Sequence, residues 1–553
     1  MPQFNRTTPG VYITQPDEFP SSIVGVQTAV PAFIGYTKYA EINGQPVYNK
    51  AIQVGSLADF ELYFGTQFET VYDITPVNPS PKKDNFDFGV EWAAISPPVP
   101  PPVASPPGGY FYYYLQSGPN SEFNLYDSMR LFYSNRGGSC YVVSVGSYGM
   151  AQQSGGINAG DLIRGLDVIR EQVGPTMLVV PDAVLLPANP SGAIAKQRIA
   201  PIQTSSQYDS VVQAMLEQCF ALQDRVAILD VYSTLSVQNE TTLEDVVSNF
   251  WTSAGVSDQQ ALNYGMAYFP FLHTNLAPVS ETTYLNLNPL TTLQQILYME
   301  SQHLYRDSPG KLTQVNGLIG KISPYKPATD KMSDVTTLNQ NLVNAIPLLA
   351  NIEQVVVEKN SVLPPSAAMA GAYTDIDGTR GVWNAPANIP LIAVTNTTYK
   401  LNDEQQGELN VPINGMAINV LRDFTGRGTV VWGARTLNGN SSDWRYIQVR
   451  RTIIYIQQSV KNALASFVFA PNTDTTWVTV TAMVSNFLAN LWAMGGLMGD
   501  KASDAFTVQC GLGSTMTGQD ILNGYMIVQV TLQMIHPAEF IELTFEQKME
   551  GVS

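Results

Sequence analysis

The clearest pattern in the chain lies between residues 110 and 363, where helical stripes alternate with short apolar runs. The apolar runs have the length of strands and occupy residues 139–145, 176–180, 225–231 and 267–272. The helical stripes between them occupy residues 161–173, 208–223 and 243–253. Strands buried on both faces form unbroken apolar runs, and helices alternating with them indicate a parallel sheet covered on both sides. We therefore expect a three-layer α/β domain here.

The start of the chain predicts a strand that has no neighbouring strand in the sequence. A short apolar run lies between two prolines and consists of Val11, Tyr12 and Ile13. Residues 17–22 follow as a connector, and residues 30–36 then form an apolar run of the buried-strand type.

The end of the chain alternates twice. Residues 525–534 predict a strand whose buried face contains Met526, Val528, Val530 and Leu532. After a break at residues 536–538, a second run contains Phe540, Ile541, Leu543 and Phe545. An unpaired strand is a template for another chain, and strand addition to a neighbour's sheet supplies main-chain hydrogen bonds. Two possibilities stay open: the terminal strands pair with other copies, or they fold back onto their own domain.

The remaining segments differ in regularity. Residues 76–109 are rich in proline and are expected to form an exposed, extended insertion without a strand or helix. Residues 364–440 are rich in Gly, Pro and Asn and are expected to be mostly loops. Residues 450–467 and 477–494 each carry a helical stripe, and Thr475 or Asp474 is expected to cap the second helix.

Charge is unusually scarce for a chain of 553 residues, since charged side chains make up only 14%. A soluble protein has roughly 25%. Either much of the surface is covered by other subunits, or the protein is a monomer with a surface rich in Ser, Thr and Asn. The net charge of −17 and the lack of a basic run argue against nucleic acid as a partner.

Three distant cysteines, with no C-x-x-C pair, give no disulfide framework and no thiolate zinc site. The first ten residues contain no apolar signal segment, and no run of about 18 apolar residues exists. We expect a protein that folds in a reducing cytoplasm, without a signal peptide and without insertion into a membrane.

The chain also lacks the patterns of enzymes. There are three histidines and no G-x-S-x-G sequence for a hydrolase nucleophile. The glycine pairs at 426–428 and 511–513 lack the third glycine of a dinucleotide loop, and no ligand cluster has metal spacing. We predict a protein that is not an enzyme and has no catalytic residue, cofactor or metal.

A series of motifs in a fixed order resembles the contractile tail sheath family, which includes phage tail sheaths, R-type bacteriocin sheaths and sheaths of extracellular contractile injection systems. The motifs cover residues 1–65 and 360–550 best and are Pro9-Gly10-Val11-Tyr12, Asp377-Gly378-Thr379-Arg380-Gly381-Val382-Trp383, Val431-Trp432-Gly433-Ala434-Arg435-Thr436, Phe467-Val468-Phe469 with Pro471-Asn472, and Pro537-Ala538-Glu539-Phe540-Ile541.

The resemblance implies a structural subunit that forms stacked hexameric rings around an inner tube and contracts to drive that tube through a target envelope. It also implies baseplate and terminal cap proteins as partners, and strand exchange by both terminal arms. A C-terminal helix with the loop after it would face the tube, and its candidate contacts are Ser485, Asn486, Asn490, Asp500, Lys501 and Asp504.

With this resemblance, the predicted fold class is a multi-domain α/β (α+β) protein with exchanged terminal strands. The predicted division is an N-terminal arm at 1–24, a sheath core from 25–75 and 364–535, a proline-rich insertion at 76–109, an inserted subtilisin-like α/β domain at 110–363, and a C-terminal arm at 536–553. Two other interpretations stay open: a static tail, tube or capsid protein, and an α/β hydrolase.

Overall fold

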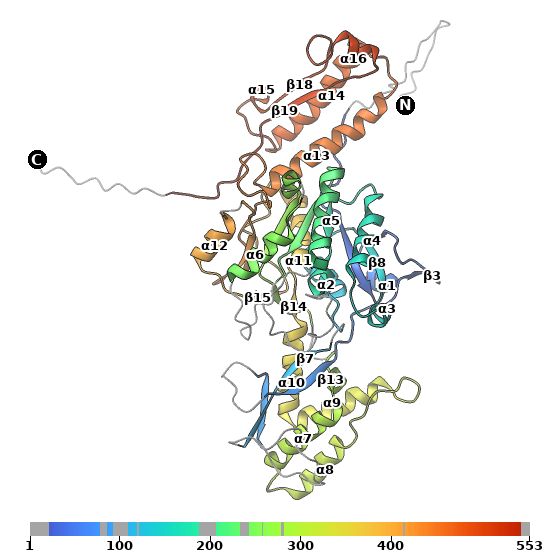
Figure 1. The fold of residues 1–553 in the computed structure, drawn as a ribbon, viewed down its shortest axis with the longest axis vertical. Coiled ribbons are helices and arrows are strands. Elements are labelled where there is room, and N and C mark those ends of the chain that lie inside the picture. Colours follow the sequence, from blue (N-terminus) through green and yellow to red (C-terminus); the bar gives the residue numbers. More distant parts are fainter. Residues whose placement is uncertain are drawn as a thin grey trace, which may run out of the picture. The chain divides into compact units, whose positions relative to one another are not determined.

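The computed structural model describes residues 22–77, 86–91, 109–118, 121–186, 206–232, 243–256, 258–277, 281–412 and 415–542. The chain forms two compact units (Figure 1). Unit 1 contains Met1–Gln27 and Arg451–Ser553, and unit 2 contains Thr28–Arg450.

Unit 2 is built on an eight-stranded sheet whose inner strands run parallel. In spatial order the strands are β17 (Gly428–Val431), β16 (Asn419–Phe424), β11 (Gly265–Phe269), β10 (Val226–Asp230), β9 (Met177–Val179), β1 (Pro31–Thr37), β8 (Cys140–Ser147) and β4 (Ile52–Val54). The edge strands β17 and β4 pair antiparallel with their neighbours. The predicted apolar runs are confirmed as buried strands, because β1, β9, β10 and β11 are buried at every position.

Helices cover both faces of this sheet. Phe33 of β1 meets Phe132 of α2 (Leu125–Ser134), with ring centroids 5.1 Å apart. The next residue, Ile34, points to the other face, where it lies against Gly165 of α4 (Ala159–Arg170). On the α2 side the second helix is α11 (Ser366–Thr379), and on the α4 side it is α5 (Ser206–Leu222), followed by α6 (Leu243–Ser253). The three layers predicted from the sequence are therefore present.

A second apolar core within unit 2 forms what we call the outer lobe. Its four-stranded sheet has the order β13 (Leu287–Asn288), β5 (Tyr72–Pro76), β7 (Tyr110–Ser117) and β6 (Phe88–Glu91). Its helices are α7 (Leu290–Leu304), α8 (Pro309–Ile319), α9 (Met332–Ala345) and α10 (Pro347–Asn360). The strands β5–β7 come from the connection between β1 and β8, and the rest from the connection between β11 and β16. The lobe is thus assembled from two distant segments of the chain.

Smaller elements complete unit 2. They are the hairpin β2 (Glu41–Ile42) and β3 (Gln45–Pro46), the helices α1 (Leu57–Phe64), α3 (Tyr148–Gln153) and α12 (Asp403–Asn410), and a three-stranded sheet of β12 (Leu272–Thr274), β14 (Val362–Leu363) and β15 (Val394–Thr397).

Unit 1 contains a helical layer and a small sheet. Its elements are the part of α13 (Ile447–Leu464) from Arg451 onward, then α14 (Asp474–Ala493), α15 (Ala502–Ala505), β18 (Phe506–Gln509), α16 (Gly518–Leu522) and β19 (Gln529–Leu532). Tyr455 of α13 packs on Phe487 of α14 with ring centroids 5.9 Å apart. The amide of Val26 donates to Ser459, which ties the start of the chain to α13.

The structure differs from the sequence predictions in four places. Helix α11 lies in the region expected to be loops, β6 lies in the proline-rich insertion, β19 covers only part of 525–534, and the cap of α14 is Thr473. The first difference has a simple cause, since α11 is buried over most of its surface and shows no apolar stripe.

The compact units also divide the chain elsewhere than the predicted domains. Strand β1 and the hairpin β16–β17, assigned to the sheath core, share one sheet with β8–β11, assigned to the inserted domain. The main-chain ladders of the parallel strands join these segments into one unit.

Candidate inter-subunit surface

The small sheet of unit 1 has one covered face and one open face. Strands β18 and β19 pair antiparallel, with Val508 opposite Val530 and Thr507 opposite Thr531. Phe506, Val508, Val530 and Leu532 are half-buried, and strand β18 packs beside α14. Thr507, Gln509, Gln529 and Thr531 are exposed.

Both outer edges of this sheet are open among the described residues, because β18 and β19 pair only with each other. A two-stranded sheet is marginal by itself in water, and open edges offer unpaired amide and carbonyl groups to a further strand. Of the four predicted acceptor positions, Val530 and Leu532 lie in β19, and Met526 and Val528 precede it with the same half-buried orientation.

The segment after β19 belongs to no strand as far as Glu542. It nevertheless presents two large apolar side chains to water, since Phe540 is 73% exposed and Ile541 is 78% exposed. Leu543 and Phe545, predicted to continue this strand, lie outside the described residues, as do Val11, Tyr12 and Ile13. The exchange of strands therefore stays a prediction at both ends of the chain.

Helix α14 turns an uncharged face outward. Its buried stripe includes Trp477, Val480, Val484, Phe487 and Leu491. The opposite face contains Val478, Thr479, Ala482, Asn486, Asn490 and Ala493, all exposed. Only Asp474 carries a charge between residues 462 and 499. A helix face that is exposed to water and carries no charge is typical of a surface that a partner covers.

The predicted tube contacts all lie in unit 1. Asn486 and Asn490 are exposed on α14, whereas Ser485 is half-buried. Asp500, Lys501 and Asp504 are exposed around α15. The indole of Trp492 donates to the carbonyl of Gly499 at 2.8 Å, so the loop before α15 is held against the end of α14.

The loop between α13 and α14 has a feature that the motif Phe467-Val468-Phe469 does not by itself predict. Phe469 is fully exposed and has a φ of 68°, a backbone conformation that residues other than glycine rarely adopt. The loop is fixed behind it, because Asn472 accepts from the Trp477 indole at 2.6 Å and donates to the Tyr525 carbonyl at 2.9 Å. The loop thus holds an apolar ring in water, where a partner surface could bury it.

Comparison with known proteins agrees with this geometry. Residues 440–548 match the family described as the phage tail sheath C-terminal domain. The chain has the fold and the C-terminal domain of the contractile tail sheath proteins. No curated protein matches the chain.

Three solved structures share the fold over nearly the full length of both chains. The sheath complex of the extracellular contractile injection system PVC, in its contracted state, is 24% identical, with 99% of each chain covered and a TM-score of 0.57. The 6-fold symmetrised baseplate of the anti-feeding prophage is 25% identical, with 98% of this chain and 100% of that chain covered and a TM-score of 0.54. The contracted helical sheath of the same prophage is 24% identical, with the same coverage and a TM-score of 0.55.

In unit 2, internal hydrogen bonds occupy carboxylates at the places where parallel sheets usually bind ligands. Such sites lie at the carboxyl ends of the strands, near the point where the strand order reverses. There the Asp182 carboxylate accepts from the amides of Tyr36 and Asn124, at 2.8 and 2.7 Å. Burial raises the pKa of Asp182 to about 6, while these hydrogen bonds oppose the rise.

A second buried carboxylate begins helix α11. Asp230, at the end of β10, accepts from the amide and the hydroxyl of Ser366. Burial raises the pKa of Asp230 to about 7, against the effect of both hydrogen bonds. Asp230 thereby satisfies a main-chain donor at the start of the helix.

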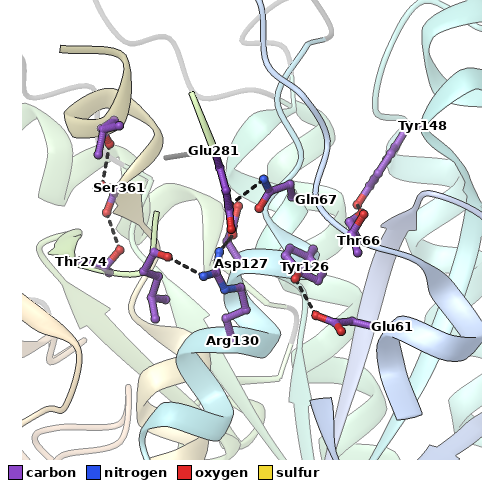
Figure 2. Close-up of polar contacts among 12 residues, drawn as sticks. Glu61, Thr66, Gln67, Tyr126, Asp127, Arg130, Tyr148, Thr274, Glu281 and Ser361 are labelled. Carbon is purple, nitrogen blue, oxygen red and sulfur yellow. Dashed lines mark hydrogen bonds and ion pairs between the residues drawn. The ribbon is translucent and has the colours of Figure 1, made fainter. Parts of the chain in front are cut away.

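A polar junction connects the sheet of unit 2 with the outer lobe (Figure 2). Arg130 of α2 pairs with Asp127 at 3.5 Å and donates to the carbonyl of Leu276. Gln67 donates to Glu281 at 3.1 Å, and the Tyr126 hydroxyl donates to Glu61 at 2.7 Å. Burial raises the pKa of Asp127 to about 6, and Arg130 opposes this.

The histidines that a hydrolase would need are dispersed. His303 lies 3.7 Å from Glu91 in the outer lobe, His273 lies in β12, and His536 follows β19. The described residues include no group of three or more His, Cys, Asp or Glu side chains placed to hold a metal. Nor do they include a helix that is long and apolar enough to cross a membrane.

Proposed function

We propose that the chain is a structural subunit of a contractile sheath, which polymerises as stacked hexameric rings around an inner tube and contracts to drive the tube through a target envelope. The full-length likeness to contracted sheath complexes supports the contractile assembly. The open-edged sheet of unit 1 is the observation that carries the proposal, because it is incomplete in a single chain.

The proposed link between subunits is strand addition. The arm that follows β19, with Phe540 and Ile541, would pair along an open edge of the β18–β19 sheet in a neighbouring copy. The N-terminal residues Val11, Tyr12 and Ile13 would form the second link. Main-chain hydrogen bonds would hold the rings together while the connectors bend, so that subunits rotate as rigid bodies during contraction.

The proposed contact with the inner tube is the uncharged face of α14 with the loop around α15. Asn486 and Asn490 would donate and accept hydrogen bonds without the desolvation cost of a full charge, and Asp500, Lys501 and Asp504 would form ion pairs at the rim. Baseplate and terminal cap proteins would contact the end rings.

The particle that best fits the comparisons is an extracellular injection system, assembled in the bacterial cytoplasm and released afterwards. The subunit would act without catalysis. The contacts of Asp182 and Asp230 support this, because both buried carboxylates accept hydrogen bonds that hold neighbouring elements of the fold together.

Electron microscopy of a variant without residues 537–553 tests the proposal. The intact chain should form tubular polymers of two lengths, extended and contracted. The deletion variant should stay folded and soluble and should form none, since it lacks the arm. Sheaths formed by the deletion variant would contradict strand exchange, and tubes of one fixed length from the intact chain would favour a static tube.

A further inference from the structure

The sheet of the outer lobe has a face lined with tyrosines that the proposed sheath function does not use. Along β7, Phe111, Tyr113 and Leu115 point into the lobe's core. The alternate residues Tyr110, Tyr112 and Tyr114 therefore point to the opposite face. Tyr110 is 45% exposed, and the other two are half-buried.

These three tyrosines form an aromatic row along one face of β7. The rings of Tyr110 and Tyr112 are stacked with centroids 6.2 Å apart and 26° between their planes. Phe86 lies against Tyr112 at 4.5 Å. Gly89 pairs with Tyr112 across the strands, and a Cβ there would press on the Tyr112 ring. The glycine thus lets this ring lie flat on the sheet.

We propose that this aromatic row is the docking face for the chain's own proline-rich segment, residues 96–107. That segment contains seven prolines, with Pro97 and Pro100, and Pro98 and Pro101, each spaced by three. In a polyproline II helix, which has three residues per turn, residues spaced by three share one face. Surfaces lined with aromatic side chains bind such helices. The loss of conformational entropy on docking is small, because the helix is already formed.

The attachment of the segment favours docking within one chain. The 17 residues 92–108, which lie outside the described residues, leave β6 after Glu91 and rejoin the chain at Gly109. Glu91 is paired with Tyr110, so both ends start at one end of the aromatic row. The row from Tyr110 to Tyr114 is about 14 Å long at ~3.4 Å per residue. The five residues before Pro97 span up to roughly 17 Å, enough to reach the far end of the row.

The tether also raises the local concentration of the segment. A binding segment that is joined to its site by a short flexible linker has an effective concentration in the millimolar range at that site. Weak docking in solution would therefore suffice to fill the face in the intact chain. The covered row would also keep three tyrosines from forming an aggregation-prone patch.

A peptide with the sequence of residues 96–107 tests the docking. We would titrate the labelled peptide, by fluorescence anisotropy, into the full chain and into a variant in which an equally long Gly/Ser sequence replaces 96–107. The peptide should bind the replacement variant saturably and the intact chain at least tenfold more weakly, because the native segment competes. A peptide with alanine for proline should lose the binding, because it does not form a polyproline II helix.

The Y110S/Y112S/Y114S change, made in the replacement variant, should abolish peptide binding while circular dichroism confirms the fold. Equal binding to the intact chain and the replacement variant would overturn the proposal, because the face would then be empty in the intact chain. A lack of binding to the folded replacement variant would overturn it as well. If competition in the intact chain grows with chain concentration, the segment comes from a second copy, and docking within the chain is wrong.

Discussion

The two units of the molecule treat their apolar side chains in opposite ways. Unit 2 surrounds its sheet with helices and pairs its buried carboxylates with main-chain amides. Unit 1 is much the smaller unit, yet it holds twelve of the 23 large apolar side chains that are exposed in the described chain. Unit 1 therefore exposes more large apolar side chains for its size than unit 2 does. This difference supports our proposal that the contacts of assembly lie in unit 1.

The largest expected effect concerns the arm of unit 1. Exchanging Phe540 and Ile541 for serine should abolish sheath formation, because a docked strand needs its apolar side chains in the neighbour's pockets. The free energy of unfolding should change by less than about 0.5 kcal/mol, since both residues are exposed. Urea unfolding and electron microscopy measure the two quantities.

Leu62 and Val173 provide a matched control, because both are exposed apolar residues of unit 2. Their exchange for serine should leave sheaths intact. If both pairs abolish assembly equally, the contrast between the units does not hold.

The next effect compares one substitution in the two units. Phe33 is fully buried in the sheet of unit 2, and Phe33→Ala should cost about 3–5 kcal/mol because it leaves a cavity. Phe469 is fully exposed in unit 1, and Phe469→Ala should change the stability by less than about 0.5 kcal/mol. Urea unfolding of both variants measures this, and a similar loss in both would refute the division.

A third effect depends on pH and lies in the outer lobe. Burial raises the pKa of Glu353 from 4.5 to about 7, and its Oε1 has no hydrogen-bond partner among the residues that the structure describes. The unfolded chain releases this proton near pH 4.5, whereas the folded chain keeps it to about pH 7. Folding stability should therefore fall as the pH rises through this window, by up to roughly 3 kcal/mol.

Glu353→Gln should remove that loss and make the chain more stable than the wild type at pH 8. Urea unfolding at pH 5 and pH 8 measures the change. The exposed Glu408 provides the control, and Glu408→Gln should change nothing. An unchanged pH dependence in the Glu353 variant would show that this carboxyl is ionised in the folded chain.

The smallest expected effect tests the outer face of α14. Replacing Asn486 and Asn490 with glutamate should bury uncompensated charge at the contact with the tube. The affinity of the sheath for its tube, measured by co-sedimentation, should fall about tenfold, or by about 1.4 kcal/mol. Gln340 and Asn344 of α9 have the same spacing and exposure, so glutamates there provide the control. Equal effects at both sites would point to general charge repulsion.

The sequence predicted the elements whose pattern has one dominant cause. Strands β1, β9 and β10 are buried on both faces and therefore form apolar runs. Helix α14 has a single buried stripe and ends at Ala493, shortly before Gly495, whose φ of 80° suits the turn after a helix. In each case local spacing and tertiary packing agree.

Other features depend on contacts that no local pattern encodes. Helix α11 shows no apolar stripe because it is buried on nearly every side. Its own small residues, such as Ala367, Ala370 and Gly371, allow this close packing. The outer lobe was missed because its core joins residues near Tyr113 with residues near Leu293, which are far apart in the sequence. The exposed Phe469 belongs to a motif, but only its backbone conformation indicates a role.

The central position of β1 has a consequence for synthesis. Strand β1 leaves the ribosome long before the strands that join it in the sheet, since β8 follows about 100 residues later, β9 about 140 residues later, and β16 and β17 only after residue 418. At 5–20 residues per second, the sheet waits roughly 20–80 s for its last strands. The segments that would link neighbouring copies at the C-terminus are translated after that, so a nascent chain cannot use them before its largest sheet is ready to close.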